Sequence, residues 1–118
     1  MAHSEYDFDV VMQDFSCGNY ADVLRTTLPH AMSGNPDAQC MISLLYQNGL
    51  GVAKDLAEAE SWLLKAAEQG SSLAWNNLGT LYAMGGDGLS RGPDWAQTCY
   101  IRAKELGFDC AQPYPPEA

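Results

Sequence analysis

Apolar residues between positions 36 and 69 recur at intervals of three and four, the spacing that places side chains on one face of an α-helix. The first such segment, 36–48, begins with Pro36 and is followed by a glycine, and these residues are typical of the first turn and the end of a helix. The second segment opens at Asp55, a good N-cap residue, and ends at about Gln69. A short loop over 49–52 separates the segments, so the pattern predicts two antiparallel helices. Their apolar positions are Ala38, Met41, Ile42, Leu45 and Tyr46 in the first helix, and Leu56, Ala59, Trp62, Leu63, Ala66 and Ala67 in the second.

A second pair of helices is predicted over positions 72–107. Ser72 is the expected N-cap of the first helix, which the glycines at 85, 86 and 88 interrupt. Pro93 begins the last helix, and Gly107 follows its end. The apolar positions are Ala74, Trp75, Leu78, Leu81 and Tyr82, and then Trp95, Ala96, Cys99, Tyr100, Ala103 and Leu106.

The N-terminal part of the chain shows a looser form of the same pattern. Residues 6–15 predict a short helix, residues 17–20 a turn, and residues 20–33 a partner helix. Pro29 lies inside this partner and removes a backbone hydrogen bond, so we expect a bend around Arg25 to Pro29. At the other end, the prolines of residues 110–118 favour an extended conformation that forms a strap or a frayed end.

The stretch from Gly34 to Gly70 recurs with a shift of 36 or 37 positions. A period in the thirties is typical of stacked helical units, each of which needs its neighbours to bury its apolar face. We therefore predict an all-α superhelix of about three antiparallel helical hairpins. The expected domain is 1–109, with an incomplete first repeat 4–34, repeats 35–70 and 71–107, and a tail 110–118. The matching pairs are Gly34 and Gly70, Ala38 and Ala74, Tyr46 and Tyr82, Ala59 and Ala96, Ala66 and Ala103, and Gly70 and Gly107.

The net charge of the chain limits the kinds of partner that it is expected to bind. Six Lys and Arg oppose fifteen Asp and Glu, which leaves a formal net charge of -9. Such a chain repels nucleic-acid phosphates and anionic membrane surfaces, so we expect neither as a partner. No apolar run reaches the roughly 18 residues of a membrane span, and the first ten residues lack the basic and apolar segments of a secretion signal. These features predict a cytoplasmic protein.

The sulfur and polar side chains predict no catalytic or metal site. Cysteines at 17, 40, 99 and 110 lack the paired spacing of a zinc site, so we expect reduced thiols and no cofactor. His30 is expected to pack against other side chains, because no nucleophile stands near it in the sequence. The glycine-rich segment 85–88 lacks the Lys and the Ser or Thr of a phosphate-binding loop, so it predicts a turn. A turn is also a better interpretation of this region than a calcium site formed by Asp87 and Asp94. Glu58, Glu60 and Glu68 are expected on a solvated helix surface.

Two stretches of the chain resemble a known family of helical repeats. The sequence LLYQNGLGVAKDLAEAESWLLKAAEQG at 44–70 is similar to the Sel-one-like repeat, a relative of the tetratricopeptide repeat. The sequence LAWNNLGTLY at 73–82 resembles the first helix of both families, whereas the loop at 88–92 departs from the pattern. The resemblance implies a protein-interaction module without enzyme activity. It is compatible with a small adaptor, a chaperone-like binder, or an inhibitory or immunity-type partner.

The resemblance also implies where a protein or peptide binds. In related arrays the first helix of each hairpin lines the concave face, where Leu44, Leu73 and Met84 would form an apolar strip. The implied partner-binding residues are Asp37, Cys40, Leu44, Gln47, Asn48, Leu73, Asn76, Thr80, Ala83 and Met84. The alternative is a hydrolase-like enzyme related to the cysteine-rich, penicillin-binding members of the family. The chain lacks their two cysteines per repeat, so that activity is not carried over.

Aromatic side chains have two expected roles. Tyr46, Trp62 and Tyr82 are expected to fill the wedges between hairpins, and truncating Trp62 costs about 3 to 5 kcal/mol if it is buried. The C-terminal end of the array needs a cover, because Trp95, Tyr100, Phe108 and Tyr114 supply more aromatic surface than one helix hides. Either the tail folds over this end or a second copy does. We therefore expect a monomer or a weak homodimer.

Overall fold

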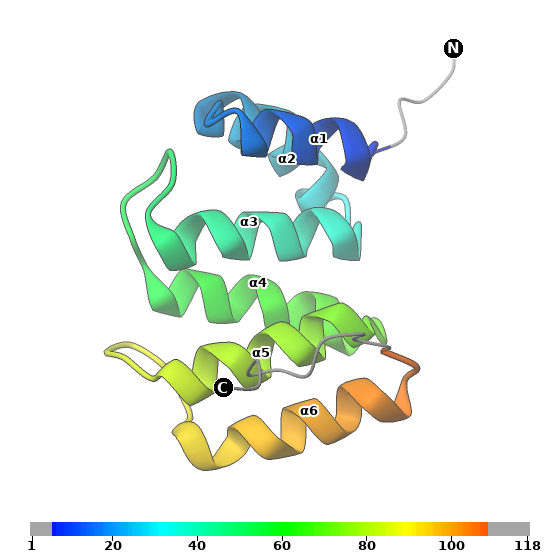
Figure 1. Ribbon diagram of the computed structural model, residues 1–118, viewed down its shortest axis with the longest axis vertical. Helices are drawn as coiled ribbons and strands as arrows, with labels where there is room; N and C mark the ends of the chain where they lie inside the picture. Colours follow the sequence, from blue (N-terminus) through cyan, green and yellow to red (C-terminus); the bar gives the residue numbers. More distant parts are fainter. Residues whose placement is uncertain (1–5, 109–118) are drawn as a thin grey trace.

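The computed structural model describes residues 6–108, which form six α-helices stacked as antiparallel hairpins (Figure 1). The first hairpin consists of α1 (Phe8–Ser16) and α2 (Tyr20–Met32), and the second of α3 (Pro36–Asn48) and α4 (Leu56–Glu68). In the third hairpin, α5 (Ser72–Met84) pairs with α6 (Ala96–Glu105). A short 3-10 helix, η1 (Pro93–Trp95), comes directly before α6. The described part measures 44 × 30 × 28 Å, and the hairpins follow one another along its long axis. The all-α superhelical prediction is confirmed.

Capping residues explain where the helices begin. The side chains of Asn35 and Asp55 accept hydrogen bonds from the backbone N–H groups of Ala38 (3.0 Å) and Glu58 (3.1 Å), as N-cap residues do. The cap of α5 is Ser71, not Ser72, and its Oγ accepts from the N–H of Ala74 at 3.1 Å. Both serines are suitable residues, and the extended backbone of Ser71 decides between them.

Two further details of the helices differ from simple expectations. The last helix begins as a 3-10 turn over Pro93–Trp95 before α6 continues it. Pro29 stands within α2, which runs to Met32 as one helix, and the bend expected there stays a prediction.

Within residues 6–108, none of the helices has the length and apolar character that crossing a membrane requires.

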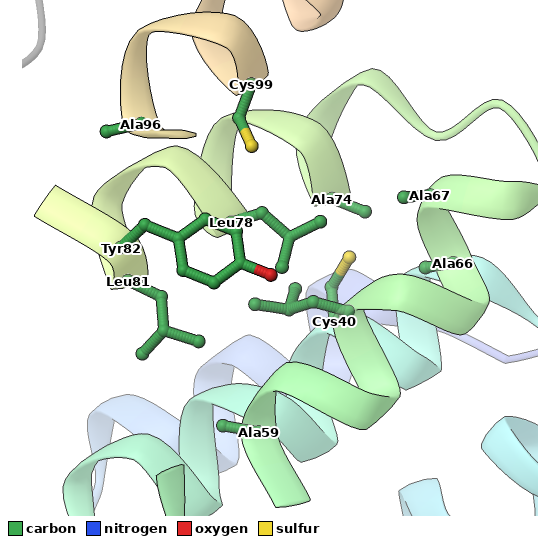
Figure 2. Close-up of a cluster of buried hydrophobic side chains, with 11 residues drawn as sticks. Cys40, Ala59, Ala66, Ala67, Ala74, Leu78, Leu81, Tyr82, Ala96 and Cys99 are labelled. Atoms are coloured by element: carbon green, nitrogen blue, oxygen red, sulfur yellow. The ribbon is translucent and has the colours of Figure 1, made fainter. Parts of the chain in front are cut away.

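The core consists of two clusters of buried side chains. One lies between the first and second hairpins and the other between the second and third, and Tyr46 of α3 packs against both. The second cluster brings together residues of α3, α4, α5 and α6, many of them alanines that let the helices approach closely (Figure 2). The buried members of the first are Val11, Val23, Ala31, Ala38, Met41, Ile42 and Leu45; those of the second are Cys40, Ala59, Leu63, Ala66, Ala67, Ala74, Leu78, Leu81, Tyr82, Ala96 and Cys99.

The three expected wedge residues are not equally buried. Tyr82 is buried in the second cluster, whereas Tyr46 and Trp62 are only partly buried. The indole of Trp62 packs against the first cluster and lies 4.5 Å from the ammonium of Lys65. Because the ring is not fully enclosed, truncating Trp62 is expected to cost less than the range given for a buried residue.

Two glycines bring elements into close contact. A Cβ atom on Gly79 of α5 would lie 2.6 Å from Cε1 of Tyr100, so the missing side chain lets the Tyr100 ring of α6 rest on α5. Gly51 has a φ of +75°, and a Cβ there would lie 3.1 Å from the backbone carbon of Tyr20. The loop between α3 and α4 is therefore fitted against the start of α2.

The buried side chain of Gln39 links α3 to the helices on either side of it. Its Nε2 group donates to Ala31 O of α2 at 3.0 Å, and its Oε1 accepts from Nε2 of Gln69, the C-cap residue of α4, at 3.0 Å.

Candidate functional site

The first helices of the second and third hairpins, α3 and α5, are in contact and leave a groove between them. We call it the α3–α5 groove. Its volume is about 310 Å³, and it lies open to the surface. The residues that line it are Ser43, Leu44, Gln47, Asn48, Asn76, Asn77, Thr80 and Met84.

The helical spacing of the sequence places these residues on one face. On α3, Leu44 and Asn48 are four residues apart, and the Nδ2 group of Asn48 donates to Leu44 O at 3.1 Å. On α5, Asn76 and Thr80 have the same spacing, and the Thr80 hydroxyl donates to Asn76 O at 3.3 Å. Both side chains are thus fixed to their own helices. The Thr80 hydroxyl also lies 3.3 Å from that of Tyr100 on α6, and either can donate.

The groove carries no charge, and its lining combines polar and apolar side chains. None of its lining side chains is ionisable, although the whole chain carries a formal net charge of -9. The Nε2 group of Gln47 reaches across the groove and makes a weak contact of 3.8 Å with the sulfur of Met84. Within residues 6–108, the carboxamides of Asn76 and Asn77 make no hydrogen bond. Two donor and acceptor groups are therefore available to a ligand.

Apolar surface accompanies these amides. Met84 is 68% exposed at the end of α5, and Leu44 is partly buried on α3. A thioether is flexible and polarizable, so Met84 can adapt to side chains of different shape. The combination suits a ligand that has both apolar side chains and amide groups.

Six of the ten implied partner-binding residues line this groove: Leu44, Gln47, Asn48, Asn76, Thr80 and Met84. Asp37 and Ala83 are exposed but stand outside the lining, and Leu73 packs against the second core cluster. Cys40 requires a correction, because its side chain is only 3% exposed and belongs to the core. Burial, which disfavours a charged thiolate, raises the pKa of Cys40 to about 12.

Two residues of the lining were missed by the sequence reasoning. Ser43 stands four residues before Gln47, and Asn77 stands three residues before Thr80, so their helical spacing was an available signal. The Ser43 hydroxyl donates to Cys40 O at 2.6 Å and is buried. Asn77 therefore adds more to the groove's accessible polar surface than Ser43 does.

Glu60 is a second correction. Glu58 and Glu68 are exposed as expected, but Glu60 of α4 is only 5% exposed. Its Oε2 accepts hydrogen bonds from the hydroxyl of Tyr82 at 2.5 Å and from the hydroxyl of Ser90, and its Oε1 accepts from the Ser90 N–H at 3.0 Å. Three donors thus compensate the buried carboxyl, which lies beside no cation within the described residues. The pKa of the Tyr82 hydroxyl is raised, first by burial and then by its bond to Glu60.

The carboxyl of Glu60 fastens the loop that follows the groove. Ser90 belongs to the segment 85–92, which connects α5 to η1 and begins directly after Met84. The segment also packs closely on α4, because a Cβ on Gly86 would lie 2.3 Å from Cδ1 of Leu56. Glu60 therefore has a structural role here, and it stands outside the groove lining.

Other polar residues show no converging arrangement. His30 is partly buried, and its ring lies 5.2 Å from that of Tyr6. The thiol of Cys17 is free and exposed, and those of Cys40 and Cys99 are free and buried. Across residues 6–108, no group of three His, Cys, Asp or Glu side chains is placed to hold a metal ion.

A family model named the Sel1 repeat matches residues 36–71 and 72–108. The chain belongs to the Sel1 repeat family. Members of this family generally mediate protein–protein interactions, and the fold is typically a binding scaffold without catalysis. No curated protein matches the chain.

Solved structures of Sel1 repeat proteins are similar in fold. One is the crystal structure of a Sel1 repeat protein from Oxalobacter formigenes, whose sequence is 34% identical to this chain and whose fold matches it with a TM-score of 0.71. The match covers 84% of this chain and 40% of that protein. A protective antigen present in uropathogenic Escherichia coli strains, which displays an SLR fold, is 30% identical, with a TM-score of 0.71 over 86% of this chain and 22% of that one. The chain thus spans less than half the length of either protein.

Proposed function

We propose that the α3–α5 groove binds a segment of another protein, and that the chain acts as a small adaptor or as an inhibitory or immunity-type partner. The observation that carries this proposal is the pair of free carboxamides, Asn76 and Asn77, beside the exposed Met84. A carboxamide has one carbonyl acceptor and two N–H donors, so it can pair with both polar groups of a peptide bond. The neighbouring Leu44 and Met84 offer apolar contacts for the side chains of the same segment.

Binding accounts for the groove better than hydrolysis does. The hydroxyls of Ser43 and Thr80 are hydrogen-bonded to carbonyls of their own helices, and neither a histidine nor a carboxylate stands in the lining. A nucleophile needs an adjacent base to lose its proton at neutral pH. We therefore propose a non-catalytic role for this surface.

Compartment and assembly are part of the same proposal. The free thiols of Cys17, Cys40 and Cys99 support a reducing compartment such as the cytoplasm. We propose that the chain acts as a monomer or a weak homodimer. Outside the groove, the exposed large apolar side chains of η1 and α6 and of the end of α6 are Trp95, Ile101 and Leu106, and three such side chains support weak association at most.

The test is capture of a partner by the full chain and by the variant Leu44→Asp, Asn76→Asp, Met84→Asp. A matched control, Leu64→Asp, Gln97→Asp, Ile101→Asp, adds the same charge at exposed positions outside the groove. We expect the partner to be kept by the wild type and the control and lost by the groove variant, with circular dichroism showing that all three are folded. A partner that also binds the groove variant would show that the α3–α5 groove is not the binding surface.

A further inference from the structure

The polar side chains of the α3–α5 groove limit the conformation that a bound segment can have. Asn76 and Asn77 are partly buried, and within residues 6–108 their carboxamides have no hydrogen-bond partner. A ligand that covers these groups removes them from water, and it loses affinity unless it supplies donors and acceptors of its own. The conformation of the ligand determines whether it has such groups to offer.

A helical segment has few of them. Inside an α-helix the backbone N–H and C=O groups are paired with each other, so only the termini and the polar side chains remain available. Helices that bind in grooves use apolar side chains repeated every three or four residues. Six of the eight residues that line the α3–α5 groove are polar, and Leu44 and Met84 are the two apolar ones. This lining does not match the apolar face of a helix.

An extended segment has the opposite character. Its backbone N–H and C=O groups have no partners within the segment, and they point outwards along both of its edges. A carboxamide can pair with either group, because its NH2 donates and its carbonyl oxygen accepts. Gln47 adds a third carboxamide to those of Asn76 and Asn77, since its Nε2 makes only the weak 3.8 Å contact with the sulfur of Met84.

The length of the groove fits a short extended segment. Its two walls, α3 and α5, are the first helices of their hairpins and run in the same direction (Figure 1). On α5 the lining extends from Asn76 to Met84, which is about 12 Å at a rise of roughly 1.5 Å per residue. An extended chain advances about 3.3 Å per residue, so about three or four residues occupy this length.

We infer that the α3–α5 groove binds an extended segment of about three or four residues and holds it through its main chain. This inference rests on the proposed function and specifies the kind of partner. The segment belongs to a loop, a terminus or an unstructured linker of the partner, and not to the surface of a folded helix. Asn76 and Asn77 pair with its backbone, and its alternate side chains contact Leu44 and Met84.

A phage-displayed library of random peptides, selected on the immobilised full chain, supplies the probes. Peptides whose binding is lost in the variant Leu44→Asp, Asn76→Asp, Met84→Asp are groove ligands. We expect these peptides to share apolar residues at positions i and i+2, which is the period of an extended chain. Apolar residues shared at i, i+3 and i+4 would indicate a bound helix and would overturn the inference.

A change in the peptide backbone tests the main-chain contacts directly. Replacing one amide of a synthetic groove ligand by an ester removes its N–H donor, and we expect this to weaken binding to the wild type about 5-fold at one or more positions. The same ester should weaken binding less than about 2-fold in Asn76→Leu or Asn77→Leu, whichever lacks the carboxamide that accepts from that N–H. Gln97→Leu removes an exposed carboxamide outside the groove and should keep the wild-type response.

The pattern of these losses separates the inference from the proposed function. In a helical ligand, an ester breaks a hydrogen bond within the peptide, so binding weakens equally in the wild type and in both asparagine variants. Equal losses of this kind, or no loss at any position, would overturn the inference and leave the proposed function standing. A selection that yields no groove-dependent peptide would overturn both. Circular dichroism verifies that all the variants are folded.

Discussion

The hydroxyl of Tyr82 on α5 donates a 2.5 Å hydrogen bond to Oε2 of Glu60 on α4. Both residues are buried, and the same carboxyl also receives the N–H and the hydroxyl of Ser90. One acidic side chain thus connects the second hairpin, the third hairpin and the loop that leads to η1. Because this loop leaves α5 directly after Met84, the connection also supports one end of the α3–α5 groove.

Tyr82→Phe removes one of the donors to Glu60 and keeps the buried ring. We expect the free energy of unfolding to fall by about 2 kcal/mol, because removing one partner of a buried hydrogen bond costs roughly 1 to 3 kcal/mol. Urea denaturation followed by circular dichroism measures the change. Tyr46→Phe is the matched control, since the Tyr46 hydroxyl has no hydrogen-bond partner within residues 6–108. Equal losses in the two variants would show that the Glu60 bond contributes nothing.

The buried thiol of Cys40 makes the stability of the folded chain depend on pH in the alkaline range. Burial raises the pKa of its thiol from 9.0 to about 12 in the folded chain, so this contribution to stability is complete below pH 9 and is lost as the pH rises towards 12. Between about pH 8 and pH 10.5, the loss from this residue is on the order of 2 kcal/mol. Urea midpoints at the two pH values should therefore differ less in Cys40→Ala than in the wild type.

The exposed Cys17 provides the control for this experiment. Cys17→Ala removes a thiol that is exposed and lies outside the core, and its urea midpoints at the two pH values are measured beside those of Cys40→Ala. Tyr6, Tyr82 and Cys99 also have raised pKa values, mainly through burial, and they lower stability at alkaline pH in all the variants alike. A pH dependence unchanged by Cys40→Ala would show that the thiol titrates equally in the folded and unfolded chains.

Gly79→Ala should destabilise the protein by about 1 to 3 kcal/mol, the usual cost of overpacking a core. The new Cβ would lie 2.6 Å from Cε1 and 2.8 Å from Cδ1 of Tyr100, which is closer than carbon atoms approach. In an unhindered helix the same change stabilises by about 1 kcal/mol, so the contact with Tyr100 decides the sign. Thermal or urea unfolding of the single variant measures the net effect.

A double-mutant cycle isolates this contact. In the Tyr100→Ala background the ring is absent, and Gly79→Ala should become neutral or stabilising. The Tyr100 hydroxyl also lies 3.3 Å from the hydroxyl of Thr80. Both proteins in the Tyr100→Ala background lack this contact, so its loss cancels when they are compared. If Gly79→Ala is equally harmful in both backgrounds, the ring of Tyr100 is not its cause.

Helix positions were predictable because their signals are local. The apolar spacing and the flanking proline and glycine located α3 at Pro36–Asn48, and Asp55 was recognised as the cap of α4. An error of one residue arose where two neighbouring residues could both cap, at Ser71 and Ser72. Backbone conformation, which the sequence does not state, settled that choice.

Glu60 and Cys40 were misjudged for the opposite reason. On a helical wheel Glu60 stands beside Ala67 at the border of the apolar face of α4, whereas Cys40 stands on the face of α3 opposite its apolar positions, so the period predicts the burial of neither residue. Glu60 is covered because Ser90, thirty residues away in the chain, folds over it. Cys40 is enclosed because it packs with residues of the next two helices, among them Ala67 and Ala74.

The sequence by itself determined the helices, their pairing in hairpins and the repeat that stacks them, because periodic apolar positions and turn residues act over a few neighbouring residues. Only the tertiary structure decided that Leu44, Asn76 and Met84 share one groove and that Glu60 is buried. These features depend on distances between residues about thirty positions apart in the chain. Such distances follow from how whole helices pack, which no local pattern specifies.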